Sequence, residues 1–262
     1  MNRLKRFLHP NQALLEDQRV AAAIVSDILL ELEKLTKPGV NLDMLDELAA
    51  RRIVEYGAIS ANKNYLPSWA KIPFPATICA SVDSEVCHGI PNGRVLEEGQ
   101  IIKYDIGIKY RSGCGDAALT MAVGNISNRQ DRTMRYARQA LKEGIKKVRA
   151  GVSLLEIGSA IQYYATMNGY EIIKEFGGHA IGREMHMAPL IPHYPLPENA
   201  EILLQAGQVI CLEPMLSPGD GKIGLATDQW TTFTLDRQCV AMFEEMILVK
   251  EQGYEILTHH LI

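Results

Sequence analysis

Two aspartates lie in a stretch of the sequence that otherwise predicts buried β-strands. The segment YDIGIKYRSGCGDAALTM, residues 104–121, places Asp105 and Asp116 among isoleucine, leucine and alanine residues. We expect two strands here, joined by a tight turn at residues 112–115. Burial penalises an ionised carboxylate and like charges repel, so two neighbouring buried acids need a compensating charge. The pattern therefore indicates that this hairpin contributes to a site for cations.

Two further acids are set in apolar, strand-like runs. Glu213 lies in VICLEPML, and Glu244 lies in CVAMFEEMILVK. A divalent cation keeps such carboxylates ionised because it is the largest local charge. Three or four carboxylates with a histidine suit two hard or borderline ions about 3.5–4 Å apart, the spacing found in two-metal hydrolases.

Histidines are available for such a site, although each has a structural alternative. His179 and His186 lie in EFGGHAIGREMHMAP, and His88 lies in SEVCHGIP. A histidine in a glycine-rich loop is often only a structural hydrogen-bonding residue, and an aspartate at a strand end often forms a turn. The acids are spread from residue 105 to residue 244, so spacing alone leaves the metal site open.

The elements that would carry these residues follow from hydrophobic periodicity and from the positions of glycine and proline. Apolar residues at helical spacing predict helices over 12–35, 42–56, 129–149 and 154–167. Apolar runs of the β type predict strands over 76–82, 101–110 and 118–123, and the end of the chain is strand-rich.

An internal repeat organises these elements into two similar parts. Residues 38–57 resemble residues 150–169, with glycines at corresponding places. Residues 98–108 resemble residues 206–216, and an acid follows the glycine by six places in both copies. The acid is the first aspartate of the hairpin in one copy and Glu213 in the other. We infer two αβ halves that are related by a pseudo-twofold axis, with a site between them.

Composition narrows the class of protein. The chain has 262 residues, of which 47% are hydrophobic and 22% charged, as is typical of a globular protein with a large buried core. Its net charge of −4 gives no electrostatic reason to expect nucleic acid or an anionic membrane as a partner. Five unclustered cysteines without a CxxC pair argue against a disulfide framework or a zinc ribbon. With no signal-peptide or membrane-spanning pattern, we expect a cytoplasmic location.

Five short motifs together resemble those of type I methionine aminopeptidases, metallopeptidases with the pita-bread (creatinase/aminopeptidase) fold. They are CHGIP at residues 87–91, YDIG followed eleven residues later by GD, GHAIGREMH, CLEPM and FEE. The resemblance covers nearly the whole chain. It implies an α+β fold in which two pseudo-twofold-related αβ halves share a central curved antiparallel sheet, with helices on the outside. We therefore expect a single catalytic domain over 1–262, with halves of about 1–124 and 125–262.

The resemblance assigns a metal-binding role to five residues. Asp105 would bind one ion in a bidentate manner, His179 and Glu213 would bind the other, and Asp116 and Glu244 would bridge the two. The implied cofactors are two divalent ions, and cobalt, manganese, iron and zinc all tolerate this ligand set. The paired acids of the hairpin would then be tolerated because cations neutralise them.

The activity that the resemblance implies is removal of the initiator methionine from nascent proteins, preferably before a small second residue. A water molecule activated between two metal ions would attack the scissile carbonyl, and Glu213 would move its proton toward the leaving amine. His186 would hydrogen-bond the carbonyl oxygen as negative charge develops there. His88 would contact the substrate backbone near the scissile bond and assist proton handling, unless it only stabilises its own turn. We expect a monomer that acts near the ribosome on the N-termini of nascent polypeptides and binds neither nucleic acid nor membrane.

An unbranched thioether side chain requires a narrow apolar pocket with sulfur and aromatic contacts. Phe74, Cys79, Met185 and Trp230 match the positions that would line it. Cys79 and Met185 could instead be ordinary core residues. Trp230 lies between polar residues, which favours a place at a cleft.

The sequence departs from the expected family pattern at five positions beside the motifs. Cys114 replaces a histidine, Ala117 and Ala118 replace Thr-Ser, Ala180 replaces a glycine, and Glu245 replaces a histidine. Each change would alter hydrogen bonds around the metal ligands, which tune metal affinity and activity. Alternation along a strand predicts that Glu245 points outward.

Three alternatives remain open. A proline-specific peptidase or creatinase relative would share the fold, although such proteins normally carry an additional N-terminal domain. A methionine aminopeptidase-like enzyme could have a shifted cleavage preference because of the five altered positions. A non-catalytic peptide-binding module could use the same scaffold. The retention of the five ligands and of His88 and His186, called the helper histidines below, argues against it.

Overall fold

The computed structural model describes residues 12–258 of the chain. This part contains four α-helices, which are α1 Gln12–Leu35, α2 Leu42–Glu55, α3 Asn128–Ile145 and α4 Leu154–Met167. The strands before α3 are β1 Ile59–Ser60, β2 Cys79–Val82, β3 Glu85–Cys87, β4 Ile101–Tyr110 and β5 Gly113–Ala122. The later strands are β6 Glu171–Ile172, β7 Gly178–Ala180, β8 Met187–Ile191, β9 Val209–Leu212, β10 Met215–Ser217, β11 Ile223–Leu225, β12 Thr232–Thr234, β13 Ala241–Met242, β14 Glu245–Val249 and β15 Tyr254–Ile256, with a 3-10 helix at Pro197–Asn199.

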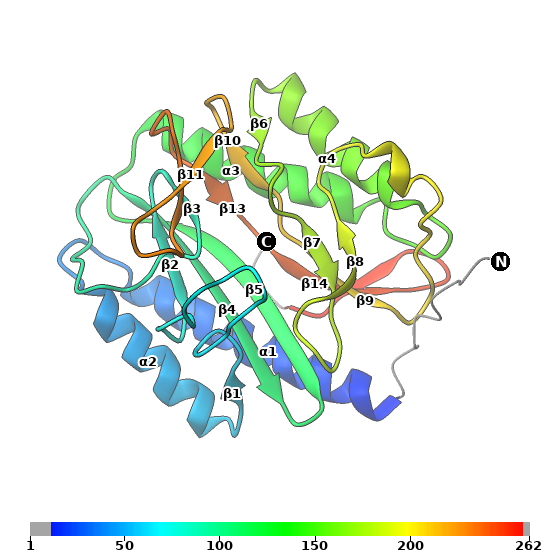
Figure 1. Cartoon of the computed structure of the whole chain (residues 1–262), viewed down its shortest axis with the longest axis horizontal. Helices are drawn as coiled ribbons and strands as arrows, with labels where there is room; N and C mark the ends of the chain where they lie inside the picture. The colour runs from blue at the N-terminus through cyan, green and yellow to red at the C-terminus, as the bar shows by residue number, and fades with distance from the viewer. Residues whose placement is uncertain (1–11, 259–262) are drawn as a thin grey trace.

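The first half is built around the long hairpin of β4 and β5. β4 pairs with β5 on one edge and with β1 and β2 on the other, in each case antiparallel. α1 packs against this hairpin through buried aliphatic side chains such as Ile28 and Leu32. Its close approach requires glycine at position 115, where a Cβ atom would lie 2.6 Å from the carbonyl carbon of Ala21. Figure 1 shows α1 and α2 covering this sheet from one side.

The second half uses the same kinds of element. β9 pairs with β14 and β7, and β15 and β8 extend the sheet at its two edges. α3 and α4 pack against each other and lie along this half in Figure 1. Both helices begin with a serine cap: Ser127 forms a capping box with Gln130, and Ser153 accepts the backbone N–H of Glu156. These caps satisfy backbone N–H groups in the first turns of α3 and α4, so each helix begins directly after its serine.

The internal repeat of the sequence reappears in the backbone. The N–H of Gly39 donates to the carbonyl of Leu96 at 2.7 Å, and the N–H of Gly151 donates to that of Leu204 at 2.8 Å. The repeated glycines all have positive φ, a conformation that favours glycine, and they are Gly39, Gly57, Gly99, Gly151, Gly169 and Gly207. They therefore hold equivalent turns in the two halves. The boundary between the halves near residue 124 stays a prediction.

The two halves meet at the free edge of β5. The backbone N–H of Glu244 donates to the carbonyl of Ala118 at 2.9 Å. The hydroxyl of Thr120 donates to the carbonyl of Met242 at 2.6 Å and accepts its N–H at 2.9 Å. These bonds hold the strand that carries Asp116 against the segment that carries Glu244.

The structure corrects the predicted turn of the opening hairpin. The turn lies at Arg111 and Ser112, where Arg111 has a φ of 51°, and β5 begins at Gly113 rather than at residue 118. Two glycines in this stretch, Gly113 and Gly115, gave the appearance of a turn, although both make room for the close packing of α1. Elsewhere α3 ends at Ile145, before the predicted end at 149, because the last residues form a turn. None of the helices within residues 12–258 has the length and apolar character needed to cross a bilayer.

Candidate active site

Asp105 and Asp116 lie on the same face of the β4–β5 hairpin. Gly107 pairs with Asp116 in the strand register, and side chains at 105 and 107 point to the same face because they alternate along a strand. The two acids are therefore diagonal neighbours across the hairpin. At Gly107 a Cβ atom would lie 2.7 Å from atoms of both Asn62 and Met185, so these two side chains fill the space beside the acids.

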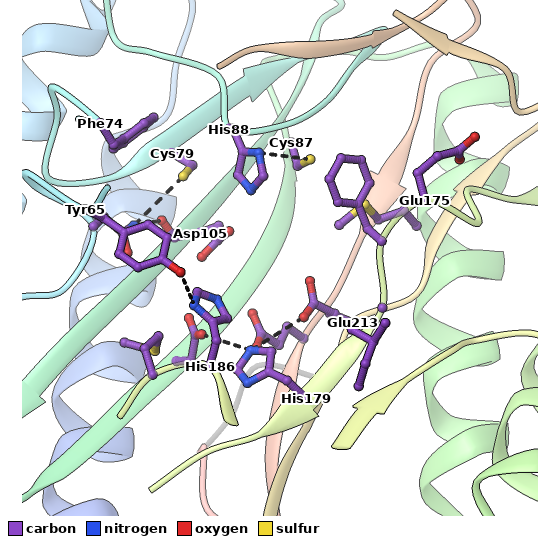
Figure 2. A pocket seen from close by; sticks show the side chains of 18 of the residues that line it. Tyr65, Phe74, Cys79, Cys87, His88, Asp105, Glu175, His179, His186 and Glu213 are labelled. Atoms are coloured by element: carbon purple, nitrogen blue, oxygen red, sulfur yellow. Dashed lines mark hydrogen bonds and ion pairs between the residues drawn. The ribbon is translucent and has the colours of Figure 1, made fainter. Parts of the chain in front are cut away.

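The second half of the chain brings three more predicted ligands to these acids. His179 lies in β7, Glu213 directly follows β9, and Glu244 lies between β13 and β14. The Nε2 atom of His179 is 3.5 Å from Oδ2 of Asp116 and 3.7 Å from Oε1 of Glu213. Figure 2 shows His179 and Glu213 facing each other, with Asp105 nearby. The five predicted ligands thus come together from both halves.

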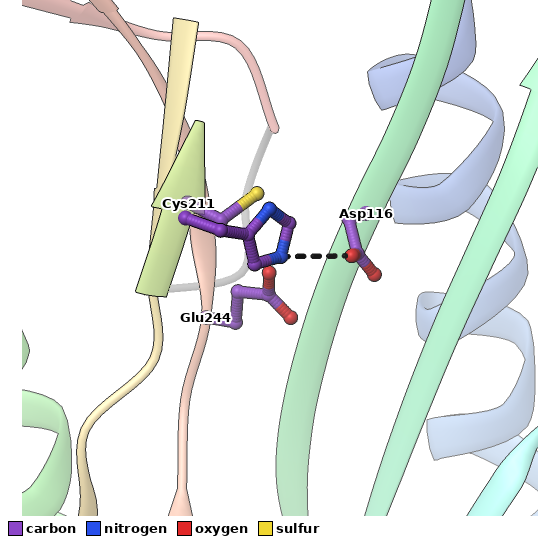
Figure 3. A group of neighbouring side chains, drawn as sticks. Asp116, Cys211 and Glu244 are labelled. Atoms are coloured by element: carbon purple, nitrogen blue, oxygen red, sulfur yellow. Dashed lines mark ion pairs between the residues drawn. The ribbon is translucent and has the colours of Figure 1, made fainter. Parts of the chain in front are cut away.

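Four buried side chains form a tight cluster that fits a metal ion. Asp116, His179, Cys211 and Glu244 place one possible ligand atom each within 4.8 Å of one another. Figure 3 draws this group and labels Asp116, Cys211 and Glu244. The Oε1 atom of Glu244 is buried and has no hydrogen-bond partner among the described residues. A buried carboxylate oxygen without a partner is costly, and a cation would supply the missing interaction. Carboxylates and imidazole are suitable ligands for manganese, iron, cobalt and zinc.

Cys211 is a member of this cluster that sequence reasoning missed. It precedes Glu213 by two positions in the CLEPM motif, so strand alternation was a signal that could have found it. Burial raises the pKa of its thiol well above the ordinary value, and the neighbouring Glu244 raises it further.

The electrostatics of the predicted carboxylate ligands favour a bound cation. Burial raises the pKa values of Asp105, Glu213 and Glu244 well above those of ordinary carboxyl groups, and the negative charge of Asp116 raises each of them further. Crowded buried acids resist ionisation. A divalent cation would reverse this effect, because it stabilises the ionised form of every carboxylate around it.

A buried histidine that was not predicted supports two of the predicted ligands. His193 is 1% exposed, and its Nε2 atom accepts backbone N–H groups from Gly178 and Glu213. Burial lowers its pKa to about 3, so the ring stays neutral and remains an acceptor. The segment IPHYP has neither acids nor glycines beside the histidine, so nothing in the sequence marked it.

All eleven site residues predicted from the sequence line one cavity of about 550 Å³. They are Phe74, Cys79, His88, Asp105, Asp116, His179, Met185, His186, Glu213, Trp230 and Glu244. The structure therefore brings together the predicted metal ligands, the helper histidines and the side-chain pocket. The roles assigned to these residues stay predictions.

Aromatic rings form one wall of the cavity. The ring centroid of Trp230 lies 5.2 Å from that of Phe74 and 5.1 Å from that of Trp69, in edge-on contacts. Trp230 is 2% exposed, and its Nε1 atom donates to the carbonyl of Ile72 at 3.2 Å. It is thus a core residue that also lines the cleft. Trp69 is 59% exposed and was missed because it lies in an irregular segment between β1 and β2.

The helper histidines lie in the cavity as neutral imidazoles. Burial lowers the pKa of His88 to about 4, and the nearby His186 adds to the effect. Burial also lowers the pKa of His186. The ring of His88 stacks on Trp69 at 6.1 Å and meets Phe176 edge-on at 5.6 Å. Aromatic contacts on two sides hold this imidazole in the cavity.

The predicted outward orientation of Glu245 needs a correction. The residue is 1% exposed, and its carboxyl group accepts a hydrogen bond from the hydroxyl of Thr258. It does not line the cavity, but the far face of β14 is buried in protein rather than open to solvent. Burial raises the pKa of this carboxyl to about 9, and Lys142 of α3 opposes that shift.

The other departures from the expected pattern are buried and locally satisfied. Cys114 donates its N–H to the carbonyl of Gly182 at 2.8 Å and its thiol to that of Arg183 at 3.5 Å. This links β5 to the loop before His186. The three alanines are at most 8% exposed, and they are Ala117, Ala118 and Ala180.

Comparison with known proteins agrees with this site. Residues 16–251 match the family model described as metallopeptidase family M24. The chain is 38% identical over 240 residues to methionine aminopeptidase 1 of Bacillus subtilis, which covers 92% of this chain and 94% of that protein. It is also similar to the crystal structure of methionine aminopeptidase from Thermotoga maritima, with a TM-score of 0.91, 32% identity, and coverage of 97% of this chain and 99% of the other.

More distant structures share the fold. The Xaa-Pro dipeptidase from Bacillus anthracis superposes with a TM-score of 0.76 at 21% identity, over 97% of this chain and 62% of the dipeptidase. These neighbours and the observed mixture of helices and antiparallel sheets confirm the predicted α+β pita-bread fold. With a family model that matches most of its length and a relative of this similarity, the chain belongs to metallopeptidase family M24.

Proposed function

We propose that this protein is a methionine aminopeptidase that removes the initiator methionine from nascent proteins, preferably before a small second residue. The observation that carries the proposal is the convergence of five predicted metal ligands from both halves on one cavity with an aromatic wall. The similarity to proteins named methionine aminopeptidase supports the same activity.

Two divalent ions are the proposed cofactors, held by Asp105, Asp116, His179, Glu213 and Glu244. The crowding of buried acids and the unpartnered oxygen of Glu244 support the binding of positive charge at this site. Cobalt, manganese, iron and zinc are all compatible with oxygen and imidazole ligands. A bound ion of this kind polarises the scissile carbonyl and lowers the pKa of water at the site.

The chain's own side chains would orient the substrate and move protons. Glu213 takes the proton of the attacking water and delivers it to the leaving amine, which requires a carboxylate within reach of both. His186 donates a hydrogen bond to the carbonyl oxygen as negative charge develops there. His88 contacts the substrate backbone beside the scissile bond. Burial lowers the pKa of His88 to about 4, so its ring is neutral and offers one donor and one acceptor.

The methionine side chain would lie against the aromatic wall. Phe74 and Trp230 offer ring edges and faces to a thioether, while Cys79 and Met185 complete a narrow, polarisable pocket. The cavity is large enough for a short substrate, since ligand sites commonly enclose about 300–1,000 Å³.

We also propose that the protein acts as a monomer in the cytoplasm, near the ribosome, where new N-termini emerge. Its net charge of −4 supports neither nucleic acid nor an anionic membrane as a direct partner.

The experiment that tests the proposal measures free amino acid released from Met-Ala-Ser and from an X-Pro peptide by metal-loaded protein. We expect methionine release that a chelator abolishes and that Asp116→Asn lowers by at least about 100-fold, the scale for a lost catalytic charge. The exposed Glu251→Gln serves as a matched control and should be fully active. Preferential cleavage of the X-Pro peptide would favour the proline-specific alternative. Lack of turnover with every ion would favour a binding module.

A further inference from the structure

We propose that Tyr65 is a positioning residue that fixes the tautomer and orientation of His186. The hydroxyl oxygen of Tyr65 lies 3.1 Å from the Nδ1 atom of His186. Figure 2 shows the two side chains joined across the cavity that both of them line. The inference rests on the proposed function, in which His186 donates a hydrogen bond to the substrate carbonyl oxygen.

A neutral imidazole carries one N–H group, so the bond at one nitrogen decides what the other nitrogen can do. The phenol of Tyr65 keeps its proton near pH 7, so its hydroxyl can donate a hydrogen bond to the Nδ1 atom of His186. When the hydroxyl donates to Nδ1, the hydrogen of the ring lies on Nε2. Nε2 is then a donor, as a developing negative charge on a carbonyl oxygen requires. In the opposite tautomer Nε2 would be an acceptor and would repel that oxygen.

The surroundings of Tyr65 hold its hydroxyl in place. Its N–H donates to the carbonyl of Asn62, and its carbonyl accepts the N–H of Phe74, both at 2.9 Å. Its ring centroid is 5.4 Å from that of His186, whose ring lies in turn 4.6 Å from that of His179. The imidazole of His186 is thus held between the phenol on one side and a predicted metal ligand on the other.

This arrangement links the substrate pocket to the helper histidine. The irregular segment between β1 and β2 carries Tyr65, and it also carries Trp69 and Phe74 of the aromatic wall. The N–H of Phe74 donates to the carbonyl of Tyr65, so the backbone that carries the phenol is bonded to a residue of the aromatic wall. Sequence reasoning missed Tyr65 because its partner is 121 positions away.

The first test compares wild-type protein with Tyr65→Phe, which removes only the hydroxyl. We expect kcat on Met-Ala-Ser to fall about 10- to 100-fold, the scale for groups that orient a functional histidine. KM should stay near the wild-type value because the ring remains. The exposed Tyr163→Phe is the matched control and should leave both constants unchanged. In a His186→Gln background, Tyr65→Phe should not lower kcat any further, because the hydroxyl acts through His186.

The second test is independent of activity. Heteronuclear NMR of ring-labelled histidine, in the zinc-loaded and the metal-free protein, reports the tautomer of each imidazole, and His186→Gln identifies the signal of His186. We expect the Nε2–H tautomer in the wild type and a mixture in Tyr65→Phe. The inference would be overturned if His186 of the wild type carried its hydrogen on Nδ1. It would also be overturned if Tyr65→Phe changed neither the tautomer of His186 nor kcat. If the NMR result holds but methionine is never released, the proposed function fails and the positioning role stands.

Discussion

The imidazole of His193 supports the backbone of Glu213: its Nε2 atom accepts the N–H of Glu213 at 3.1 Å. The same atom accepts the N–H of Gly178 at 3.3 Å, next to the predicted ligand His179. One buried, neutral ring therefore ties together two strands that each deliver a side chain to the proposed metal site. The backbone N–H groups of Gly178 and Glu213 both point at the Nε2 atom of His193, so an acceptor is needed at that position.

Replacement of His193 should weaken metal binding without removing a ligand. We expect His193→Ala to lower metal affinity about 10- to 100-fold, as for other residues that hold ligands in place. It should also destabilise the fold by about 1–3 kcal/mol, because two buried N–H groups lose their acceptor. His193→Gln keeps a carbonyl acceptor, so it should retain more of the metal affinity and more of the stability than His193→Ala does. Calorimetric titration with zinc and thermal unfolding measure these effects, and wild-type affinity in His193→Ala would contradict the account.

Lys103 should make stability depend on pH in the alkaline range. Its side chain is 1% exposed, and Nζ donates to the carbonyls of Val240 at 2.8 Å and Asp83 at 3.2 Å. Burial lowers its pKa from 10.5 to about 8. Between these two values the unfolded chain binds more protons than the folded one, so the free energy of unfolding rises with pH in that window and falls as pH drops through about 8.

Urea unfolding of wild type and Lys103→Met between these pH values isolates the contribution of this lysine. The wild-type free energy of unfolding should rise relative to that of the variant by as much as about 3 kcal/mol across the window. If the difference in free energy of unfolding between the wild type and Lys103→Met does not change with pH, the lysine is not desolvated.

Trp69 should contribute to substrate binding at the mouth of the cavity. It contacts both Trp230 and His88, and aromatic contacts of this kind are worth about 0.5–1.5 kcal/mol. We expect Trp69→Ala to raise KM for Met-Ala-Ser about 2- to 10-fold, while Trp69→Phe stays close to wild type. Leu66→Ala, in the same segment but outside the cavity lining, serves as the control. An unchanged KM in Trp69→Ala would remove this residue from the substrate site.

Gly107 should limit the length of the side chain that the pocket accepts. An added Cβ atom would lie 2.7 Å from Oδ1 of Asn62 and 2.7 Å from Cε of Met185, so both of these side chains, which line the pocket, must shift. We expect Gly107→Ala to lower kcat/KM for a methionine substrate about 10-fold or more relative to one with a shorter first side chain. Met185→Ala in the same background should restore space. Equal losses for long and short side chains would contradict a pocket effect.

The sequence predicted those elements whose pattern is long and uninterrupted. The expected helix over 12–35 and strand over 101–110 agree with α1 and β4, because each shows a strong periodicity or apolar run. The start of β5 was wrong because two glycines in a strand resemble a turn. At Gly115 a glycine is needed because α1 packs closely against the strand. This need arises from a tertiary contact, which the local sequence does not reveal.

The residues of the site also differ in whether the sequence alone could reveal them. Acids in apolar runs are conspicuous, so the predicted ligands could be selected and then matched to motifs. His193, Tyr65 and Trp69 act through contacts with residues far away in the sequence, and no neighbouring residue marks them. Glu245 shows the limit of strand alternation, which predicts the face of a side chain but not whether that face is covered.

The central claim is that acids from both halves converge in order to bind a pair of divalent ions. Isothermal titration of metal-free protein with manganese or zinc tests it most directly. We predict saturable binding of two ions per chain, strongly weakened in Asp116→Asn and unchanged in the exposed control Glu251→Gln. Absence of saturable binding, or equal binding by wild type and Asp116→Asn, would contradict it.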